Sequence, residues 1–203
     1  MKPLLASVCL AGAVCTAFAW SPVATDTPQD PQNALQDLAA MMEAAERFTE
    51  PGENHALLER FLGKWNTETQ FFMGDQTPPP DKGTSETVWL VEGRWLKSEA
   101  TGPLMGRPTQ IVSIMGYDNF KMSYVLTTVS DMDTAMTSYE GDVDPKTNAL
   151  LLYGTLDEYL TGEHDKMVKT VTRFLSEDKI VMEIHDLAIG EDNTKVLEVT
   201  YTR

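Results

Sequence analysis

The stretch GKWNTETQF, residues 63–71, marks the point at which the chain changes its hydrophobic period. Before it, apolar residues recur every three or four positions, as in a helix. Within it, every second residue from Trp65 to Phe71 belongs to the more apolar set, as in a strand with one buried face. Turn residues then recur at regular intervals to the end of the sequence. The stretch therefore marks the start of an all-β domain.

About ten strand patterns follow one another from this point. They cover approximately 64–71, 84–91, 94–101, 110–117, 122–128, 134–141, 149–156, 166–174, 179–185 and 195–201. Because no helical pattern lies between them, parallel pairing, which needs a crossover, is excluded. Closure of so large a sheet removes its exposed edges. The sequence predicts an up-and-down antiparallel β-barrel of about ten strands, and a two-layer sandwich is the alternative.

Three further segments are expected before residues 63–203, which form the barrel domain. Residues 1–19 have the pattern of a signal peptide, with Lys2, an apolar stretch and the small-x-small site Ala17-Phe18-Ala19, so export and cleavage before Trp20 are expected. An uncleaved anchor is the alternative. Residues 20–32 are rich in Pro, Thr, Asp and Gln and predict a flexible leader. Residues 33–62 contain two helical patterns, broken at Pro51-Gly52, that could cover a barrel end.

The charge and the cysteines exclude several classes of function. The formal net charge is -15, and an acidic chain repels phosphate backbones and anionic lipids, so neither nucleic acid nor a membrane surface is an expected partner. Both cysteines, Cys9 and Cys15, lie in the predicted signal peptide. The mature chain therefore has no cysteine for catalysis, metal binding or a disulfide.

For the oligomeric state, a monomer or a homodimer is expected.

Several short segments together resemble a family of bacterial calycin-like proteins known only as a domain of unknown function. They are Pro51-Gly52-Glu53-Asn54-His55, Leu62-Gly63-Lys64-Trp65, Gly93-Arg94-Trp95-Leu96, Gly116-Tyr117-Asp118-Asn119 and the ending Glu198-Val199-Thr200-Tyr201-Thr202-Arg203. The barrel is distantly similar to lipocalins, fatty-acid-binding proteins and nitrobindins. The resemblance implies an antiparallel barrel with an internal pocket and carries over no catalytic residue. Lys97 and Ser98 depart from the residues expected in this family.

The two ends of the barrel domain are expected to meet. Trp65 shares its strand parity with Phe71, and Arg203 shares its parity with Tyr201, and both parities are the more apolar ones. Arg203 can therefore stack on Trp65 where the first and last strands pair, next to Gly63. We assign these residues a structural role in barrel closure.

A barrel of this size encloses more space than its own side chains fill, so a cavity is expected. The aromatic residues predicted to line it and to bind a ligand are Trp65, Phe71, Tyr124, Tyr153 and Tyr201.

The segment Trp95 to Glu99 leaves two arrangements open. If Trp95 points inward, Lys97 and Glu99 form an ion pair in the lumen that could orient a polar ligand group. If Trp95 covers the outside, both charges are solvated. Glu86 and Glu99 are candidates for a catalytic carboxylate, which would need an apolar lumen to raise its pKa.

No metal or cofactor is expected. The aspartate pairs at 131–133 and 142–144 lack a calcium-loop pattern and are typical of solvated turns. Haem would need a histidine aimed into the lumen. His185 is the one on a strand, but it alternates with Ile184 and Met182, which predicts that it faces outward.

Three hypotheses for function follow. The first is an exported protein that binds a small, largely apolar molecule in a barrel lumen. The second is a lumenal acid–base enzyme that uses Glu86 or Glu99. The third is a protein-interaction module whose barrel is filled by its own side chains. No nucleophile elbow, phosphate loop, dinucleotide fingerprint or His-Glu-x-x-His pattern is present in the sequence.

Overall fold

The computed structural model of the chain describes residues 31–74, 77–158, 161–187 and 194–203. The predicted signal peptide and the leader up to residue 30 lie outside the described residues. The chain divides into two units at Glu43 and Ala44. The barrel and all the contacts described below belong to the second unit.

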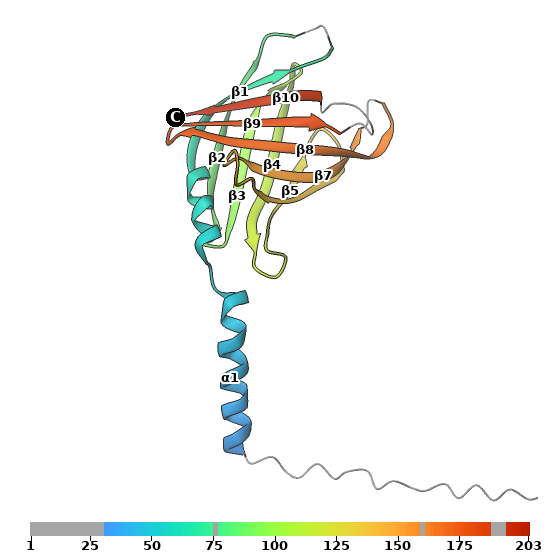
Figure 1. Ribbon diagram of the computed structural model, residues 1–203. Helices are drawn as coiled ribbons and strands as arrows, with labels where there is room; N and C mark the ends of the chain where they lie inside the picture. Colours follow the sequence, from blue (N-terminus) through green and yellow to red (C-terminus); the bar gives the residue numbers. More distant parts are fainter. Residues whose placement is uncertain (1–30, 75–76, 159–160, 188–193) are drawn as a thin grey trace, which may run out of the picture. The chain divides into compact units, whose positions relative to one another are not determined.

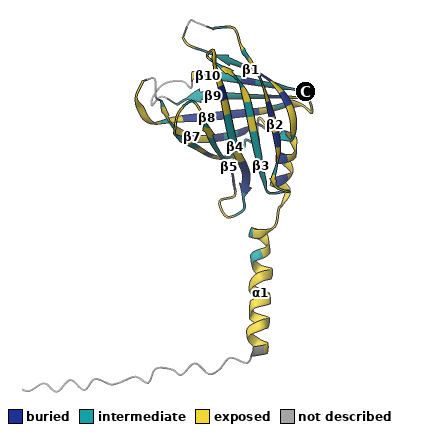
Figure 2. Cartoon of the chain, turned by 180° about the vertical axis from the view of Figure 1, so that it is seen from behind, coloured by how far each residue is buried: buried dark blue, intermediate teal, exposed yellow. Residues whose placement is uncertain are grey.

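The first helix, α1, runs from Pro31 to Thr49 and begins slightly before the position that the apolar spacing indicates. Proline suits the first position of a helix because its missing N–H would be unpaired there. Most of the following residues are good helix formers such as Ala, Gln, Glu, Leu and Met. Four of its larger apolar side chains are exposed, as the yellow colour of the helix in Figure 2 indicates: Leu35, Leu38, Met41 and Met42. No helix among the described residues is long and apolar enough to cross a membrane.

Ten strands form a closed barrel, and Figure 1 labels all of them except β6. They are β1 Gly63–Phe71, β2 Asp81–Val91, β3 Trp95–Leu104, β4 Arg107–Asp118, β5 Ser123–Ser130, β6 Met136–Val143, β7 Leu150–Glu158, β8 Glu163–Ser176, β9 Lys179–Asp186 and β10 Thr194–Thr202. Each strand pairs antiparallel with its neighbours in sequence, and β10 returns to pair with β1. The predicted up-and-down barrel is confirmed, and the two-layer sandwich is excluded.

Alternation along the strands separates an inner from an outer face. In β1 the inward residues Trp65 and Thr67 are buried, whereas Lys64 and Asn66 between them are exposed. In β2 the inward residues are Ser85 and Thr87. Because side chains point to opposite faces with a period of two, each pairing register fixes which residues face the lumen together.

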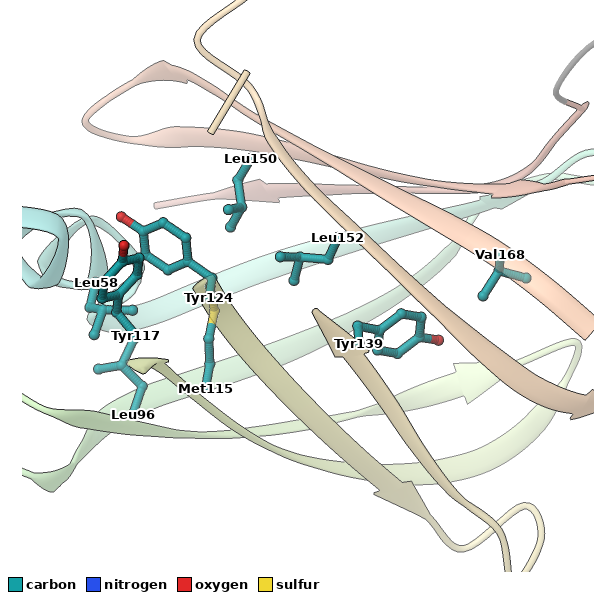
Figure 3. Close-up of a cluster of buried hydrophobic side chains, with 9 residues drawn as sticks. All are labelled: Leu58, Leu96, Met115, Tyr117, Tyr124, Tyr139, Leu150, Leu152 and Val168. Atoms are coloured by element: carbon teal, nitrogen blue, oxygen red, sulfur yellow. The ribbon is translucent and has the colours of Figure 1, made fainter. Parts of the chain in front are cut away.

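A short 3-10 helix, η1, spans Glu53–Phe61 and covers one end of the barrel. Its Leu58 is fully buried in a cluster of apolar side chains that come from several strands (Figure 3). The cluster is made of Leu58, Leu96, Met115, Tyr117, Tyr124, Tyr139, Leu150, Leu152 and Val168. Figure 3 places Leu58 beside Tyr117 and Tyr124, with Tyr139 and Val168 further along the barrel. The helix therefore closes this end, as the apolar face of residues 53–62 suggested.

Polar contacts fix η1 in this position. The backbone N–H of Gly52 donates to Nδ1 of His55 (3.0 Å), and the Tyr124 hydroxyl donates to the carbonyl of Asn54 (2.7 Å). The His55 ring also meets Tyr117 edge to face, with ring centroids 5.6 Å apart. These contacts give the segment Pro51 to His55 a structural role, because its residues order the start of the helix that covers the barrel.

The segment before η1 is held by two strand-end residues. Arg94 donates to the carbonyl of Thr49 and pairs with the Glu50 carboxylate (3.0 Å). Asn119 donates its side-chain amide to the Glu50 carbonyl (2.8 Å). The last backbone carbonyls of a helix have no hydrogen-bond partner within the helix, so they need partners from outside it. Arg94 and Asn119 belong to the sequence segments quoted above, and both have a structural role.

Candidate functional site

The barrel contains a cavity of about 410 Å³, within the size range of small-molecule sites. Its apolar lining comes from η1, from the loop after β5 and from every strand except β2, β6 and β8: Phe61, Trp65, Leu96, Ala100, Leu104, Ile111, Met115, Leu126, Met132, Leu150, Leu152, Ile180, Met182, Ile184, Leu197 and Val199. Tyr139 and Tyr201 add two phenol groups. The remaining lining residues are serines and threonines: Thr67, Thr69, Ser85, Thr87, Ser98, Ser113, Thr128, Ser130, Thr137, Thr170 and Thr172.

The lining carries no formal charge. Among the described residues, no Asp, Glu, Lys, Arg or His side chain lines the cavity. Charged pairs of these strands, such as Lys97 with Glu99 and Arg173 with Glu183, lie outside this lining. Since an unpaired ion in an apolar space costs several kcal/mol, the lumen suits uncharged molecules.

Five hydroxyl residues form a continuous row across half of the barrel. Thr87 of β2 is paired with Ser98 of β3, Ser98 with Ser113 of β4, Ser113 with Thr128 of β5, and Thr128 with Thr137 of β6. All five line the cavity. We call this row the hydroxyl belt. Directly paired residues have Cβ atoms about 4.5–5.5 Å apart, so the belt is an unbroken polar strip along the wall of the lumen.

Hydrogen bonds link neighbouring hydroxyls within and beside the belt. Thr87 donates to Ser98 Oγ (3.0 Å), and Ser113 and Thr128 are joined at 3.0 Å. Ser85, one inward position along β2, is joined to Ser98 at 3.1 Å. Ser98 is therefore the centre of a three-hydroxyl cluster.

The two lining tyrosines stay protonated at all ordinary pH values. Burial raises the pKa of Tyr139 to about 12, and burial raises the pKa of Tyr201 to about 12 as well. Both phenols are therefore neutral groups that can donate or accept a hydrogen bond.

The structure brings the expected closure residues together. The Arg203 guanidinium carbon lies 4.1 Å from the Trp65 ring centroid, and Arg203 Nη2 donates to the Leu62 carbonyl (2.6 Å). Trp65 Nε1 donates to the Phe61 carbonyl (2.9 Å). Gly63 lies below the guanidinium with a φ of 108°, a conformation that glycine adopts far more readily than other residues. The first strand, β1, the last residue, Arg203, and η1 are thus joined at one end of the barrel.

The aromatic residues predicted to line the cavity separate into three groups. Trp65 and Tyr201 line it, with their rings edge to face at 6.5 Å. Tyr124 is buried below η1 rather than in the lining, and Phe71 lies at the far end of β1 outside the lining. Tyr153 is 46% exposed on the outer face, so its expected place in the lumen is wrong.

The segment Trp95 to Glu99 has the outward arrangement. Lys97 and Glu99 pair with each other at 2.5 Å, and both side chains are close to half exposed. Trp95 covers Gly116 on the outer face, where an added Cβ would lie 2.4 Å from the Trp95 ring. The lining residues of β3 are instead Leu96, Ser98 and Ala100. The alternative of a lumenal ion pair is therefore wrong.

The two candidate catalytic carboxylates do not reach the lumen. Glu86 faces solvent and lies 3.7 Å from Lys64, with 55% of its side chain exposed. Glu99 faces outward as described. A lumenal acid–base mechanism through either residue lacks the buried carboxylate that it requires.

His185 lies on the outer face of β9, opposite in parity to the lining residues Met182 and Ile184. Its Nε2 is 3.0 Å from Glu183 Oε2, which also accepts from Arg173 (2.8 Å). Lys195 lies 3.6 Å from the other Glu183 oxygen. Although burial acts to raise the pKa of Glu183, hydrogen bonds from Arg173 and His185 and the charge of Lys195 lower this pKa to about 2. Within the described ranges, no three His, Cys, Asp or Glu side chains gather as a metal site would need.

The hydroxyl belt was missed by the sequence reasoning. Each of its residues is an ordinary strand serine or threonine, and only the pairing registers place them in one row. A signal that could have found part of the belt is the same-parity pair Ser85 and Thr87 in β2, where an apolar inner face would be expected.

Comparison with known proteins gives a family and a fold. The family described as "Protein of unknown function (DUF1579)" matches residues 50–203. Among solved structures, the chain is similar to the crystal structure of Rv2717c from M. tuberculosis, with a TM-score of 0.55 and 13% sequence identity. The match covers 76% of this chain and 99% of that chain, and at this identity it shows the fold alone. No curated protein matches the chain.

Proposed function

The chain belongs to the DUF1579 family, whose function is unknown, and we propose that its barrel binds one small, uncharged, largely apolar molecule in the lumen. The observation that carries this proposal is the cavity of about 410 Å³, lined by apolar and hydroxyl side chains and by no charged one among the described residues. Ligand sites are typically concave and mostly apolar, with a few polar groups that fix orientation. The distant resemblance to lipocalins and fatty-acid-binding proteins is in line with such a site.

The geometry also disfavours the other two hypotheses. An acid–base enzyme has no support because Glu86 and Glu99 lie outside the lumen. A barrel filled by its own side chains would leave no space, whereas this lumen keeps a volume comparable to that of small-molecule sites. Binding in the lumen remains as the function that the site supports best.

We propose further that the protein acts after export. The support is the signal-peptide pattern of residues 1–19, with a cleavage site before Trp20. Sequencing the N-terminus of the protein made with its own leader tests this: the mature chain should begin at Trp20, and an intact Met1 would contradict export with cleavage.

The test of binding compares two phenylalanine substitutions at neighbouring positions of β3. Ala100 lines the cavity, and Glu99 faces solvent, so Ala100→Phe fills the lumen while Glu99→Phe leaves it unchanged. Binding of the uncharged fluorophore N-phenyl-1-naphthylamine is measured by fluorescence, and native mass spectrometry of the purified proteins detects retained small molecules. Thermal unfolding followed by circular dichroism confirms that both variants fold.

The wild type and Glu99→Phe should bind the fluorophore, and Ala100→Phe should lose at least tenfold in affinity. Equal binding by folded Ala100→Phe would place the fluorophore elsewhere and contradict the proposal. Absence of binding in the wild type, together with no retained molecule in the mass spectrum, would also contradict it.

A further inference from the structure

We infer that the hydroxyl belt is the polar subsite of the lumen and selects an uncharged oxygen-bearing ligand, such as an alcohol, ketone or ester, over a carboxylate of the same size. This inference rests on the proposed function, because it concerns the molecule that the lumen binds. It is carried by the register of the belt, by the hydroxyl protons that its own bonds leave unused and by the absence of charge in the described lining.

The hydroxyl cluster at Ser98 has more protons than its internal bonds consume. Thr87, Ser85 and Ser98 carry three hydroxyl protons, one each. One proton is used in the bond from Thr87 to Ser98, and one in the bond between Ser85 and Ser98. Whichever of the two serines donates, one proton is left without an acceptor among the described residues.

The same count applies further along the belt. Ser113 and Thr128 share one hydrogen bond, which uses one of their two protons. The Thr137 hydroxyl has no hydrogen bond within the described part of the chain, yet it lines the cavity. The belt therefore offers several donors toward the lumen, and each hydroxyl oxygen also keeps acceptor capacity.

Such groups match a neutral oxygen atom. A ligand hydroxyl, carbonyl or ester oxygen can accept one of the unused protons, which removes the cost of leaving a donor unpaired in an apolar space. The wall across the barrel from β4 and β5 is formed by β9 and β10, whose lining residues are the apolar Ile180, Met182, Ile184, Leu197 and Val199 apart from Tyr201. A molecule with one oxygen-bearing side and an otherwise apolar body suits both walls.

A carboxylate does not match, although hydroxyls can donate to it. Burying an ion requires a compensating charge or a dense set of donors, and no cationic side chain lines the described lumen. The cations Lys97 and Lys195 are on the outer face. Ionised fatty acids should therefore bind more weakly than the corresponding alcohols.

The competing explanation is that the belt only links neighbouring strands. Thr84 and Thr101 make such a link at 3.3 Å on the exposed face of the same pair of strands. Thr84→Val is therefore a matched control, because it removes a hydroxyl and a cross-strand bond without touching the lumen. If the belt were purely structural, removing one of its hydroxyls would change ligand affinity no more than Thr84→Val does.

The experiment measures how well four ten-carbon molecules displace N-phenyl-1-naphthylamine from the whole protein: 1-decanol, 2-decanone, 1-chlorodecane and decanoate, at a pH where decanoate is ionised. The variants are Ser98→Ala, the nearly isosteric Thr87→Val and the control Thr84→Val. We expect the alcohol and the ketone to bind at least tenfold more tightly than decanoate. In Ser98→Ala and Thr87→Val they should lose about threefold to tenfold, while 1-chlorodecane and the fluorophore keep their affinity.

The results separate the two proposals. If the fluorophore does not bind at all, the proposed function and the belt inference both fall. If the fluorophore binds but decanoate competes as well as 1-decanol, the belt inference alone is overturned. It is also overturned if Ser98→Ala and Thr87→Val, both shown to fold by fluorophore binding, bind the alcohol as tightly as Thr84→Val does.

Discussion

The guanidinium of Arg203 lies over the indole of Trp65, 4.1 Å from the ring centroid, and thereby joins the last residue of the sequence to the first strand of the barrel. The same guanidinium donates to the Leu62 carbonyl at 2.6 Å, directly after η1. Trp65 in turn donates to the carbonyl of Phe61, the last residue of η1. These contacts couple barrel closure to the position of the helix that covers its end.

Replacing Arg203 by alanine should destabilise the barrel. The change removes the cation–π contact and a charged hydrogen bond, which together contribute about 1–3 kcal/mol to the free energy of unfolding. Arg203→Lys should lie between the wild type and alanine, because an ammonium lacks the planar fork. Urea unfolding measures the effect, with the exposed Lys64→Ala as control. A loss no larger than that of the control would show that the contact is not stabilising.

Gly63→Ala tests the backbone at the same position. The residue has a φ of 108°, which an alanine adopts only with strain, although the space around its Cβ is sufficient because Arg203 Nη2 would be 3.6 Å away. We expect a loss of about 1–3 kcal/mol in the free energy of unfolding. Gly52→Ala is the matched control, since Gly52 has a φ of -118° and no atom within 4 Å of an added Cβ. Equal stability of the two variants would contradict the prediction.

His55 should make the covered end of the barrel sensitive to mild acid. Burial lowers the pKa of His55 below its ordinary value of 6.5, and the charge of Arg94 lowers it further. The unfolded chain therefore binds a proton more readily, so stability falls as the pH drops from about 6.5 toward the lowered value. Protonation also removes the Nδ1 acceptor of the Gly52 N–H.

His55→Asn supplies the comparison, because an asparagine oxygen can accept the Gly52 bond without titrating. Thermal unfolding between pH 7.5 and 5 should show a steeper decline for the wild type than for the variant. Parallel pH profiles would mean that His55 is not the titrating group.

Glu183→Gln should cost stability at neutral pH, and the cost should disappear in acid. Hydrogen bonds from Arg173 and His185 and the charge of Lys195 outweigh burial and lower the pKa of Glu183 from 4.5 to about 2. Its carboxylate therefore contributes stability above about pH 4.5, and this contribution is lost as the pH falls toward 2.

At pH 7 the variant should lose about 1–3 kcal/mol in the free energy of unfolding, because its positive neighbours lose their partner. The exposed Glu86→Gln should change the same quantity by less than about 0.5 kcal/mol. A difference between wild type and Glu183→Gln that stays constant from pH 7 to pH 3 would contradict the assignment.

The barrel could be predicted from the sequence because its determinants are local. Alternation and turn residues define each strand, and the lack of crossovers leaves neighbours in sequence as neighbours in the sheet. The strand parities of Trp65 and Arg203 then sufficed to predict that both side chains lie on the same face at the same end of the barrel. None of this required knowledge of a pairing register.

The lining could be predicted only in part, because it depends on registers and on tertiary cover. Tyr153 follows three consecutive leucines, so its parity was ambiguous, and it faces outward. Tyr124 has inward parity, but the Asn54 carbonyl of η1 holds it outside the cavity lining. In residues 95–100, both faces of the strand carry apolar and polar side chains, so alternation alone does not show which face is inside. The close packing of Trp95 on Gly116 decides which face is outside.

The cover formed by η1 has a kinetic consequence for whatever the lumen holds. Because η1 and the cluster around Leu58 cover one end, a ligand bound as we propose would enter and leave through another part of the barrel. A cavity of about 410 Å³ has room for one small molecule, so under the proposed function the occupant would have to leave before a second molecule enters. Turnover of the contents is then limited by the spontaneous escape of the resident molecule, and a surplus of competitor outside does not accelerate it.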